Sequence, residues 1–228
     1  MKKICIVLTI MLLLVGCDNS SNKRYTQEDL GIYDVQSQQL ITLGSTRENI
    51  EKYIGSAQNE RSFMDTTYCG YGETVYKNVS ISNERELEIE YNVNNIAICF
   101  TLNSCWNEED NRFRLPTDVG VLSRVNEFQE KYPHYTENKL NGLNAYSSEI
   151  HLQKDNDVFK VDNFTEDDYL KFKREYINKA ISKDNSIGTS TEKSSDLLFH
   201  INQQWAYIIA EYDDYTEIKT IKMGYGWN

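Results

Sequence analysis

The sequence predicts an α+β fold built from two tandem units, each a short helix followed by an antiparallel β-meander. The first observation is a repeated helix start: ITLGSTRENIEKYIG (41–55) and VGVLSRVNEFQEKYP (119–133) share a strand end, a helix and a helix stop, 78 residues apart. The second is a repeated strand end, because IEYN (89–92) recurs as AEYD (210–213) after 121 residues. Two matches in the same order indicate a diverged tandem repeat with an insertion in its second copy.

Composition sets the broad class of the protein. A chain of 228 residues suits one large domain or two small ones. It is 39% hydrophobic and 12% aromatic, which is enough to bury a core. The net charge of -11 at pH 7 argues against nucleic-acid binding, because phosphates are bound by clustered Lys and Arg.

Residues 1–17 have the features of a signal peptide. Lys2 and Lys3 precede an apolar run from Ile4 to Val15, which is too short for an ordinary membrane span and fits the core of a signal peptide. The run ends in Leu14-Val15-Gly16-Cys17, which resembles the lipobox of bacterial lipoproteins. That resemblance implies cleavage before Cys17 and a lipid on its thiol.

A lipid on Cys17 would anchor the protein to a cell membrane on its extracytoplasmic side. An uncleaved N-terminal anchor and a plain secretory signal are the alternatives. Residues 18–38 are polar and show no clear period, which predicts a flexible tether.

Three further cysteines follow in the mature chain: Cys69, Cys99 and Cys105. An extracytoplasmic location permits a disulfide, and the odd number allows at most one pair within the chain. We expect Cys69 to pair with Cys99 or Cys105, and three free thiols are the alternative. The sequence has no CxxC, so the cysteines lack the spacing of a zinc site.

The first unit, residues 39–106, begins with the helix. Ser45 stands three residues before Glu48, as in a capping box, and Ile50 and Ile54 follow at helical spacing. Gly55 can take the left-handed conformation that ends a helix.

Strands should follow the polar segment 56–66. The alternation in ELEIEY (86–91) puts apolar residues on one face and glutamates on the other, and a turn at 92–95 leads into the apolar strand. The three expected strands are 74–81, 86–91 and 96–102.

The second unit, residues 117–228, has Pro133 where the first has its glycine stop, and we place the insertion at residues 135–195. Within the insertion, Thr165 is expected to cap a helix that runs to about Lys183, with acidic residues in its first turn. A loop at 184–195 should follow. The closing strands are expected around 197–202, 204–212 and 216–223.

Together, LGSTRENIEKYIG (43–55) and LEIEYNVNNIAICFTL (87–102) resemble the β-lactamase-inhibitor-protein-like superfamily, which includes the small outer-membrane assembly lipoproteins. The match is weaker in 119–133 and 207–223, and the long insertion and Pro133 depart from the family pattern. The resemblance implies an α+β fold and binding rather than catalysis. It assigns no contact residue.

The sequence predicts no catalytic residue, no metal site and no cofactor. His134, His151 and His200 fit no HExxH pattern and have no partner at ligand spacing. The chain contains no GxSxG, and no Gly-rich loop follows an expected strand. Acidic clusters at 166–168 and 213–214 are explained by helix capping and turns.

Aromatic side chains on strands or at their ends remain the best candidates for a binding surface. A sheet covered by helices on one face leaves the other free, and aromatic residues there would bind a partner. The alternative is that they pack the sheet against the helices, which we expect for half of the strand aromatics. Trp106 and Trp227 are the two that we favour as exposed. The candidate binding residues are Tyr68, Tyr71, Trp106, Trp205, Tyr225 and Trp227.

We therefore expect a non-catalytic, membrane-anchored module that binds an unknown envelope or secreted protein. The alternative is a lipoprotein that binds a glycan or small ligand through the same aromatics. An enzyme of unknown type ranks last.

Overall fold

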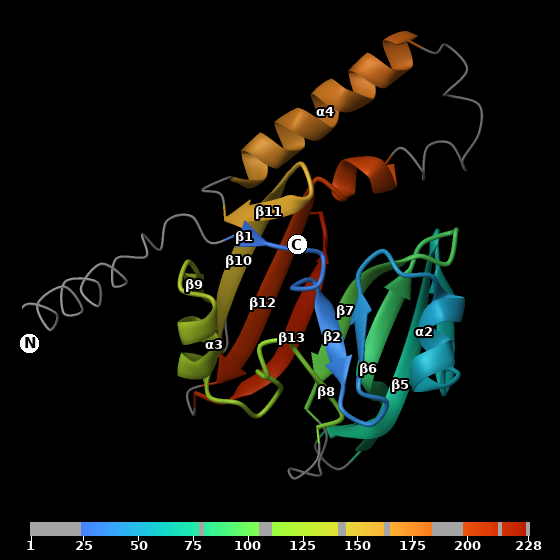
Figure 1. The fold of residues 1–228 in the computed structure, drawn as a ribbon, viewed down its shortest axis with the longest axis vertical. Coiled ribbons are helices and arrows are strands. Elements are labelled where there is room, and N and C mark those ends of the chain that lie inside the picture. Colours follow the sequence, from blue (N-terminus) through green and yellow to red (C-terminus); the bar gives the residue numbers. More distant parts are fainter. Residues whose placement is uncertain are drawn as a thin grey trace, which may run out of the picture.

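The computed structural model describes residues 24–77, 80–104, 111–140, 145–161, 165–183, 198–213 and 216–226. Antiparallel strands dominate this part of the chain, and a few helices pack beside them (Figure 1). The helices are α2 (Arg47–Ile54), α3 (Val125–Lys131) and α4 (Glu166–Lys183). The coarse prediction of an α+β, antiparallel fold is confirmed.

One large antiparallel sheet, sheet A, runs through the described residues. Its strands from the first half of the chain are β1 (Arg24–Tyr25), β4 (Asn59–Phe63), β5 (Thr66–Lys77), β6 (Ser80–Tyr91) and β7 (Ala97–Asn103). Those from the second half are β9 (Thr136–Lys139), β10 (Ala145–Asp155), β11 (Val158–Val161), β12 (Trp205–Asp213) and β13 (Ile218–Tyr225). The strand order is β1-β11-β10-β12-β13-β7-β6-β5-β4, with β9 also paired to β10.

A second, small sheet packs on one face of sheet A. Sheet B has the order β3-β2-β8 and consists of β3 (Gln39–Thr42), β2 (Gly31–Asp34) and β8 (Phe113–Arg114). Side chains of sheet B, α2 and α3 join those on one face of sheet A in a single apolar core. Figure 1 shows the arrangement of these elements. This burial of apolar surface is the main driving force for the fold.

The start of α2 is hydrogen-bonded to the first residue of β7 and to the turn that precedes β7. Gly44 N donates to Ala97 O at 2.8 Å, and Ala97 N donates to Ser45 O at 2.9 Å. Arg47 N donates to Asn95 O at 2.8 Å. These bonds satisfy backbone groups at the beginning of α2 that the helix itself leaves unpaired.

The helix start of the second half makes the same three bonds. Leu122 N donates to Ile218 O at 2.7 Å, Ile218 N donates to Ser123 O at 2.9 Å, and Val125 N donates to Thr216 O at 2.8 Å. Each of these bonds corresponds to one in the first half. The residue numbers at the helix start are higher by 78, and those at the strand are higher by 121. These are the offsets found in the sequence.

The expected tether is wrong from Arg24 onward, because residues 24–38 contribute β1 and β2. Tyr25, Leu30 and Ile32 are buried in the core. Few apolar residues occur in this segment, so no period is visible, yet each of these three is placed by a strand or turn against sheet A.

Two expected strands also differ from the structure. The segment 74–81 spans the end of β5 and the start of β6 instead of one strand. Residues 198–202 are helical, and Ile201 packs beside Trp205. The polar segment 56–66 contains β4, and the predicted loop at 184–195 lies outside the described residues. The expected α4, β12 and β13 are present.

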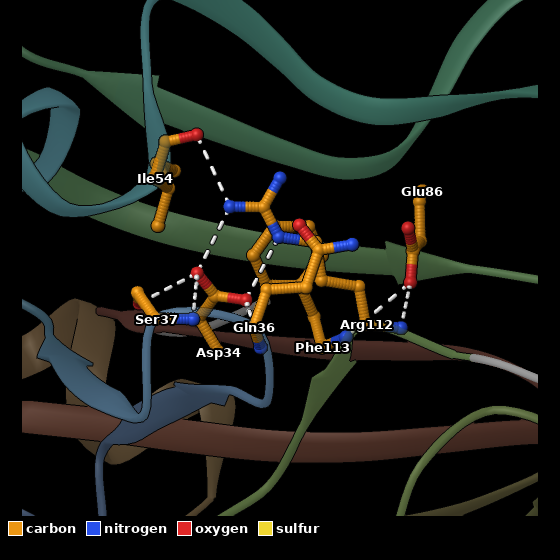
Figure 2. A network of polar contacts seen from close by, with 7 residues as sticks. All are labelled: Asp34, Gln36, Ser37, Ile54, Glu86, Arg112 and Phe113. Carbon is orange, nitrogen blue, oxygen red and sulfur yellow. Dashed lines mark hydrogen bonds and ion pairs between the residues drawn. The ribbon is translucent and has the colours of Figure 1, made fainter.

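A buried ion pair ties sheet B to the rest of the core (Figure 2). Asp34 is fully buried, and both its oxygens accept from Arg112, at 2.8 Å from Nε and 2.9 Å from Nη2. Arg112 Nη2 also donates to Ile54 O, at the end of α2, at 3.1 Å. Glu86 of β6 accepts from the backbone N–H groups of Arg112 and Phe113.

Burial alone would raise the pKa of the Asp34 carboxyl. Hydrogen bonds from Arg112 and Ser37, together with the Arg112 charge, outweigh burial and hold that pKa below its usual value. The carboxylate therefore stays ionised at neutral pH inside the core.

We predict that Arg112→Met lowers the free energy of unfolding by about 3–5 kcal/mol, because it leaves the Asp34 charge buried without its partner. Urea denaturation at pH 7 measures this. In the unsubstituted protein the Asp34 contribution should be present above the unfolded-state pKa of Asp, near 3.8, and be lost as pH falls through the lower folded-state pKa.

The matched control is Arg114→Met, which removes an exposed ion pair with Asp118 and should change stability by about 1 kcal/mol at most. Equal effects of the two substitutions would show that the buried pair does not stabilise the fold.

Candidate functional site

The open face is the side of sheet A opposite α2, α3 and sheet B. Strand register places its side chains in two rows that cross the sheet. The first row is Arg61, Tyr68, Glu90, Cys99, Gly224, Tyr207 and His151. The second row is Asn59, Gly70, Glu88, Thr101, Lys222, Ile209 and Glu149. Charged and aromatic groups thus gather on a rigid platform.

Arg61 and Tyr68 form the most exposed part of this platform. The Arg61 guanidinium lies 4.7 Å from the Tyr68 ring centroid and donates to both Glu88 oxygens, at 3.0 and 3.1 Å. The Arg61 side chain remains 69% exposed. A guanidinium stacked on a ring loses less freedom when it binds, which suits it to contact a partner.

Glu90 lies between Tyr68 and Cys99 in the first row. Burial raises the pKa of the Glu90 carboxyl, and the neighbouring charge of Glu88 adds to the rise. A hydrogen bond with the Cys99 thiol and the charges of Lys222 and Arg61 favour the carboxylate without reversing the rise in its pKa. The fold therefore holds this carboxylate in a place that disfavours its charge.

Cys99 is covered by Tyr207. The Tyr207 hydroxyl is 3.4 Å from Cys99 Sγ, and its ring passes over Gly224, where a Cβ atom would lie only 2.5 Å from that hydroxyl. Burial, followed by the charge of Glu90, raises the pKa of the Cys99 thiol to about 12. A thiol that stays protonated at neutral pH is a poor nucleophile.

Glu149 organises the far end of the second row. It accepts from Ser147 Oγ at 2.6 Å and lies 3.4 Å from His151 Nε2. Its hydrogen bond with His151 outweighs burial and lowers the pKa of the Glu149 carboxyl to about 2. The Glu149 carboxylate therefore lies between the Ser147 hydroxyl and the His151 imidazole. In a serine nucleophile the imidazole is hydrogen-bonded directly to the hydroxyl, so that it can take up the proton.

The aromatic residues predicted as a binding surface are mostly elsewhere. Tyr68 lies half-buried on the open face. Tyr71 is buried on the opposite face, where its hydroxyl lies 3.0 Å from that of Tyr91. Tyr225 packs against the core and accepts from Gln27 Nε2 at 2.7 Å.

Trp205 lies on the same side of β12 as the open-face residues but is buried. Tyr169 and Phe172 of α4 contact its ring edge to face, with centroids 5.3 and 4.6 Å away. The helix of the insertion thus covers this end of the sheet. Trp106 and Trp227 lie outside the described residues.

The cysteine prediction is wrong for one pairing. Cys69 and Cys99 are buried free thiols, and they point to opposite faces of sheet A with β6 between their strands. Cys105 lies outside the described residues. Within the described ranges no group of three or more His, Cys, Asp or Glu could hold a metal ion.

Sequence reasoning missed Arg61 and Lys222 as members of the surface. The alternation of ELEIEY did place Glu88 and Glu90 together on one face. To place Arg61 and Lys222 on the same face, one must know how β4 pairs with β5 and how β13 pairs with β7. No local sequence pattern gives that register.

Comparisons of the chain with family models, curated proteins and solved structures found no match. No helix in the described part of the chain has the length and apolar character needed to cross a membrane.

We predict that Glu90→Gln stabilises the protein at pH 7, by about 0.5–2 kcal/mol as is common for single stabilising replacements. Folding raises the pKa of the Glu90 carboxyl, so ionisation of this group lowers the free energy of unfolding. This loss of stability is absent below the unfolded-state pKa and complete above the folded-state pKa. Urea denaturation at pH 4 and pH 7 measures the change, and the gain should grow between them.

Glu88→Gln is the control, since Glu88 is already paired with Arg61. It should give no gain at pH 7. If Glu90→Gln destabilises the protein at both pH values, burial does not disfavour the Glu90 charge.

Proposed function

We propose that this protein is a lipid-anchored, extracytoplasmic, non-catalytic module that binds a protein partner through the open face. The observation that carries the proposal is the exposed Arg61 guanidinium, held by the half-buried Tyr68 and Glu88 at one end of that face. Arg and Tyr dominate the energetics of protein interfaces, because each combines a large contact area with directed hydrogen bonds.

The dimensions of the open face suit a protein better than a small ligand. Seven neighbouring strands from β4 to β10 span about 30 Å at the usual spacing of strands, and seven residues of β7 span about 25 Å. The product is close to the roughly 800 Å² that each partner buries in a standard interface. Cys99, Tyr207 and Ile209 near the middle of the face are buried, so its most accessible part is the end that carries Arg61.

We also propose that the chain is a diverged tandem repeat, as the sequence offsets suggest. The matching hydrogen bonds of the two helix starts support this. So do two left-handed positions: Gly44 (φ 84°) corresponds to Leu122 (φ 68°), and Asn95 (φ 55°) corresponds to Thr216 (φ 64°). Leucine and threonine rarely adopt this conformation, which indicates that the turn geometry was retained after the residues changed.

The ladder between β7 and β13 supports the repeat independently. Lys222 pairs with Thr101, and these two residues are equivalent at the offset of 121. The flanking pairs, Ile221 with Leu102 and Met223 with Phe100, exchange under the same offset. The two units would thus be related by a pseudo-two-fold axis through the centre of the open face.

The resemblance to the β-lactamase-inhibitor-protein-like superfamily is consistent with this arrangement and with binding as the function. It remains part of the proposal.

A glycan or small-ligand site is the weaker candidate. Such a site needs exposed aromatic faces, but Tyr71 and Trp205 are buried and Arg61 covers Tyr68. Titration of tryptophan fluorescence with glycans would reveal it.

We predict that Cys17→Ser moves the protein from the membrane fraction to the soluble fraction, because the thiol that would carry the lipid is gone. Cell fractionation followed by immunoblotting measures the distribution, and mass spectrometry of the mature N-terminus identifies the lipid. Ser20→Ala is the matched control and should stay with the membrane. An unchanged membrane fraction for Cys17→Ser would overturn the anchor.

We predict that the double variant Arg61→Ala/Tyr68→Ala loses its partner in a pull-down from detergent-solubilised membranes, with affinity reduced about tenfold or more. Quantitative mass spectrometry of the captured proteins measures the loss. Tyr53→Ala, on α2 and 45% exposed, removes a similar side chain outside the open face and should retain the partner. Failure of the unsubstituted protein to capture any protein stoichiometrically would count against the proposed function.

A further inference from the structure

The chain enters the fold at one edge of sheet A. Arg24 and Tyr25 form β1 and pair with Lys160 and Phe159 of β11. Tyr25 is 1% exposed, and its ring is stacked parallel to that of Tyr132 at 6.1 Å. The entry point is therefore fixed by burial as well as by backbone pairing.

Few residues separate this entry point from the proposed lipid. Only residues 18–23 lie between Cys17 and Arg24. A fully extended chain advances 3.3–3.6 Å per residue, so the lipid-bearing residue is within about 25 Å of β1. This step rests on the proposed lipid anchor, and it keeps the β1–β11 edge close to the bilayer.

α4 leaves the fold from the same edge. It starts at Glu166, shortly after β11 ends at Val161 (Figure 1). Its inner side packs on Trp205. Its outer side carries the exposed side chains of Leu170, Lys171 and Arg174, together with the acidic Asp167 and Glu175, whereas Tyr176 stacks on Phe172 at the inner side. Leu170, Lys171 and Arg174 suit the headgroup region of a bilayer, because an apolar side chain can insert there while cations bind lipid phosphates.

The opposite edge of sheet A presents the alternative. Phe63 and Met64 at the β4–β5 turn are 65% and 86% exposed, so this apolar tip could also touch a membrane. The strand order puts β4 eight strand spacings from β1, which is about 38 Å along the sheet. Residues 18–23 are therefore long enough to hold the β1 edge at the bilayer, but too short to reach from the β1 edge to the β4–β5 turn.

We propose that the outer side of α4 and the β1–β11 edge face the lipid bilayer, so that β4 and the Arg61–Tyr68 end of the open face point away from it. The anchor then does more than retain the protein at the membrane. It orients the binding surface toward partners that approach from the extracytoplasmic space.

The test uses the full-length lipidated protein, purified from membranes and reconstituted in vesicles of phosphatidylethanolamine and phosphatidylglycerol. A fluorophore is attached to a cysteine introduced by Lys171→Cys on α4 or by Ser62→Cys on β4, in a Cys105→Ser background. Cys69 and Cys99 are buried and should not react. Vesicles containing lipids with nitroxide-labelled headgroups then quench any fluorophore at the bilayer surface.

We expect loss of fluorescence at position 171 and none above background at position 62. Equal quenching at both positions would mean that the sheet lies flat on the bilayer, and stronger quenching at position 62 would mean that the β4–β5 turn faces it. Either result overturns the inference while leaving the proposed function intact. Absence of an acyl mass on Cys17 would instead overturn the anchor, and this inference with it.

Discussion

The antiparallel ladder between β7 and β13 is the constraint on which the rest of the structure depends. It joins strands from the two halves of the chain into one sheet, so that both halves share one core and one open face. Long-range strand pairing costs chain entropy, which the apolar residues on the covered face must repay. Ile221, Leu102 and Met223 belong to this ladder and are each 1% exposed.

The Asp34–Arg112 pair solves a second problem, which is how the connecting segments hold their place. Neither β2 and β3, which precede α2, nor β8, which precedes α3, belongs to sheet A, so these strands must be fixed by other contacts. Arg112 fixes these segments, because its guanidinium donates to the Asp34 carboxylate on β2 and to the carbonyl of Ile54 at the end of α2. A bidentate guanidinium offers this geometry, whereas an ammonium group would act as a point charge.

The local features of this fold could be predicted from sequence, but the contacts between distant segments could not. Thr165 caps α4 as the sequence predicts, whereas α2 is capped by Thr46, one residue after the expected Ser45. Strict alternation places Glu88 and Glu90 of β6 on one face, but Glu86 is buried and accepts from backbone N–H groups of the segment that enters β8. Burial of Trp205 depends on where α4 packs, and burial of Tyr25 depends on a two-residue strand. Neither carries a local signal, because both are consequences of tertiary packing.

The position of Glu90 links stability to the proposed function. A Gln would fill the same space without a charge that burial disfavours, and the hydrogen bond from Cys99 and the charges of Lys222 and Arg61 offset that penalty only in part. Stabilising changes are readily available to proteins, and residues that resist them are concentrated at sites where another requirement applies. A cationic group of a partner beside Glu90 would offset the cost of its charge, as Arg61 does for Glu88. The proposed binding through the open face would in this way give the Glu90 carboxylate a partner that the fold alone supplies only in part.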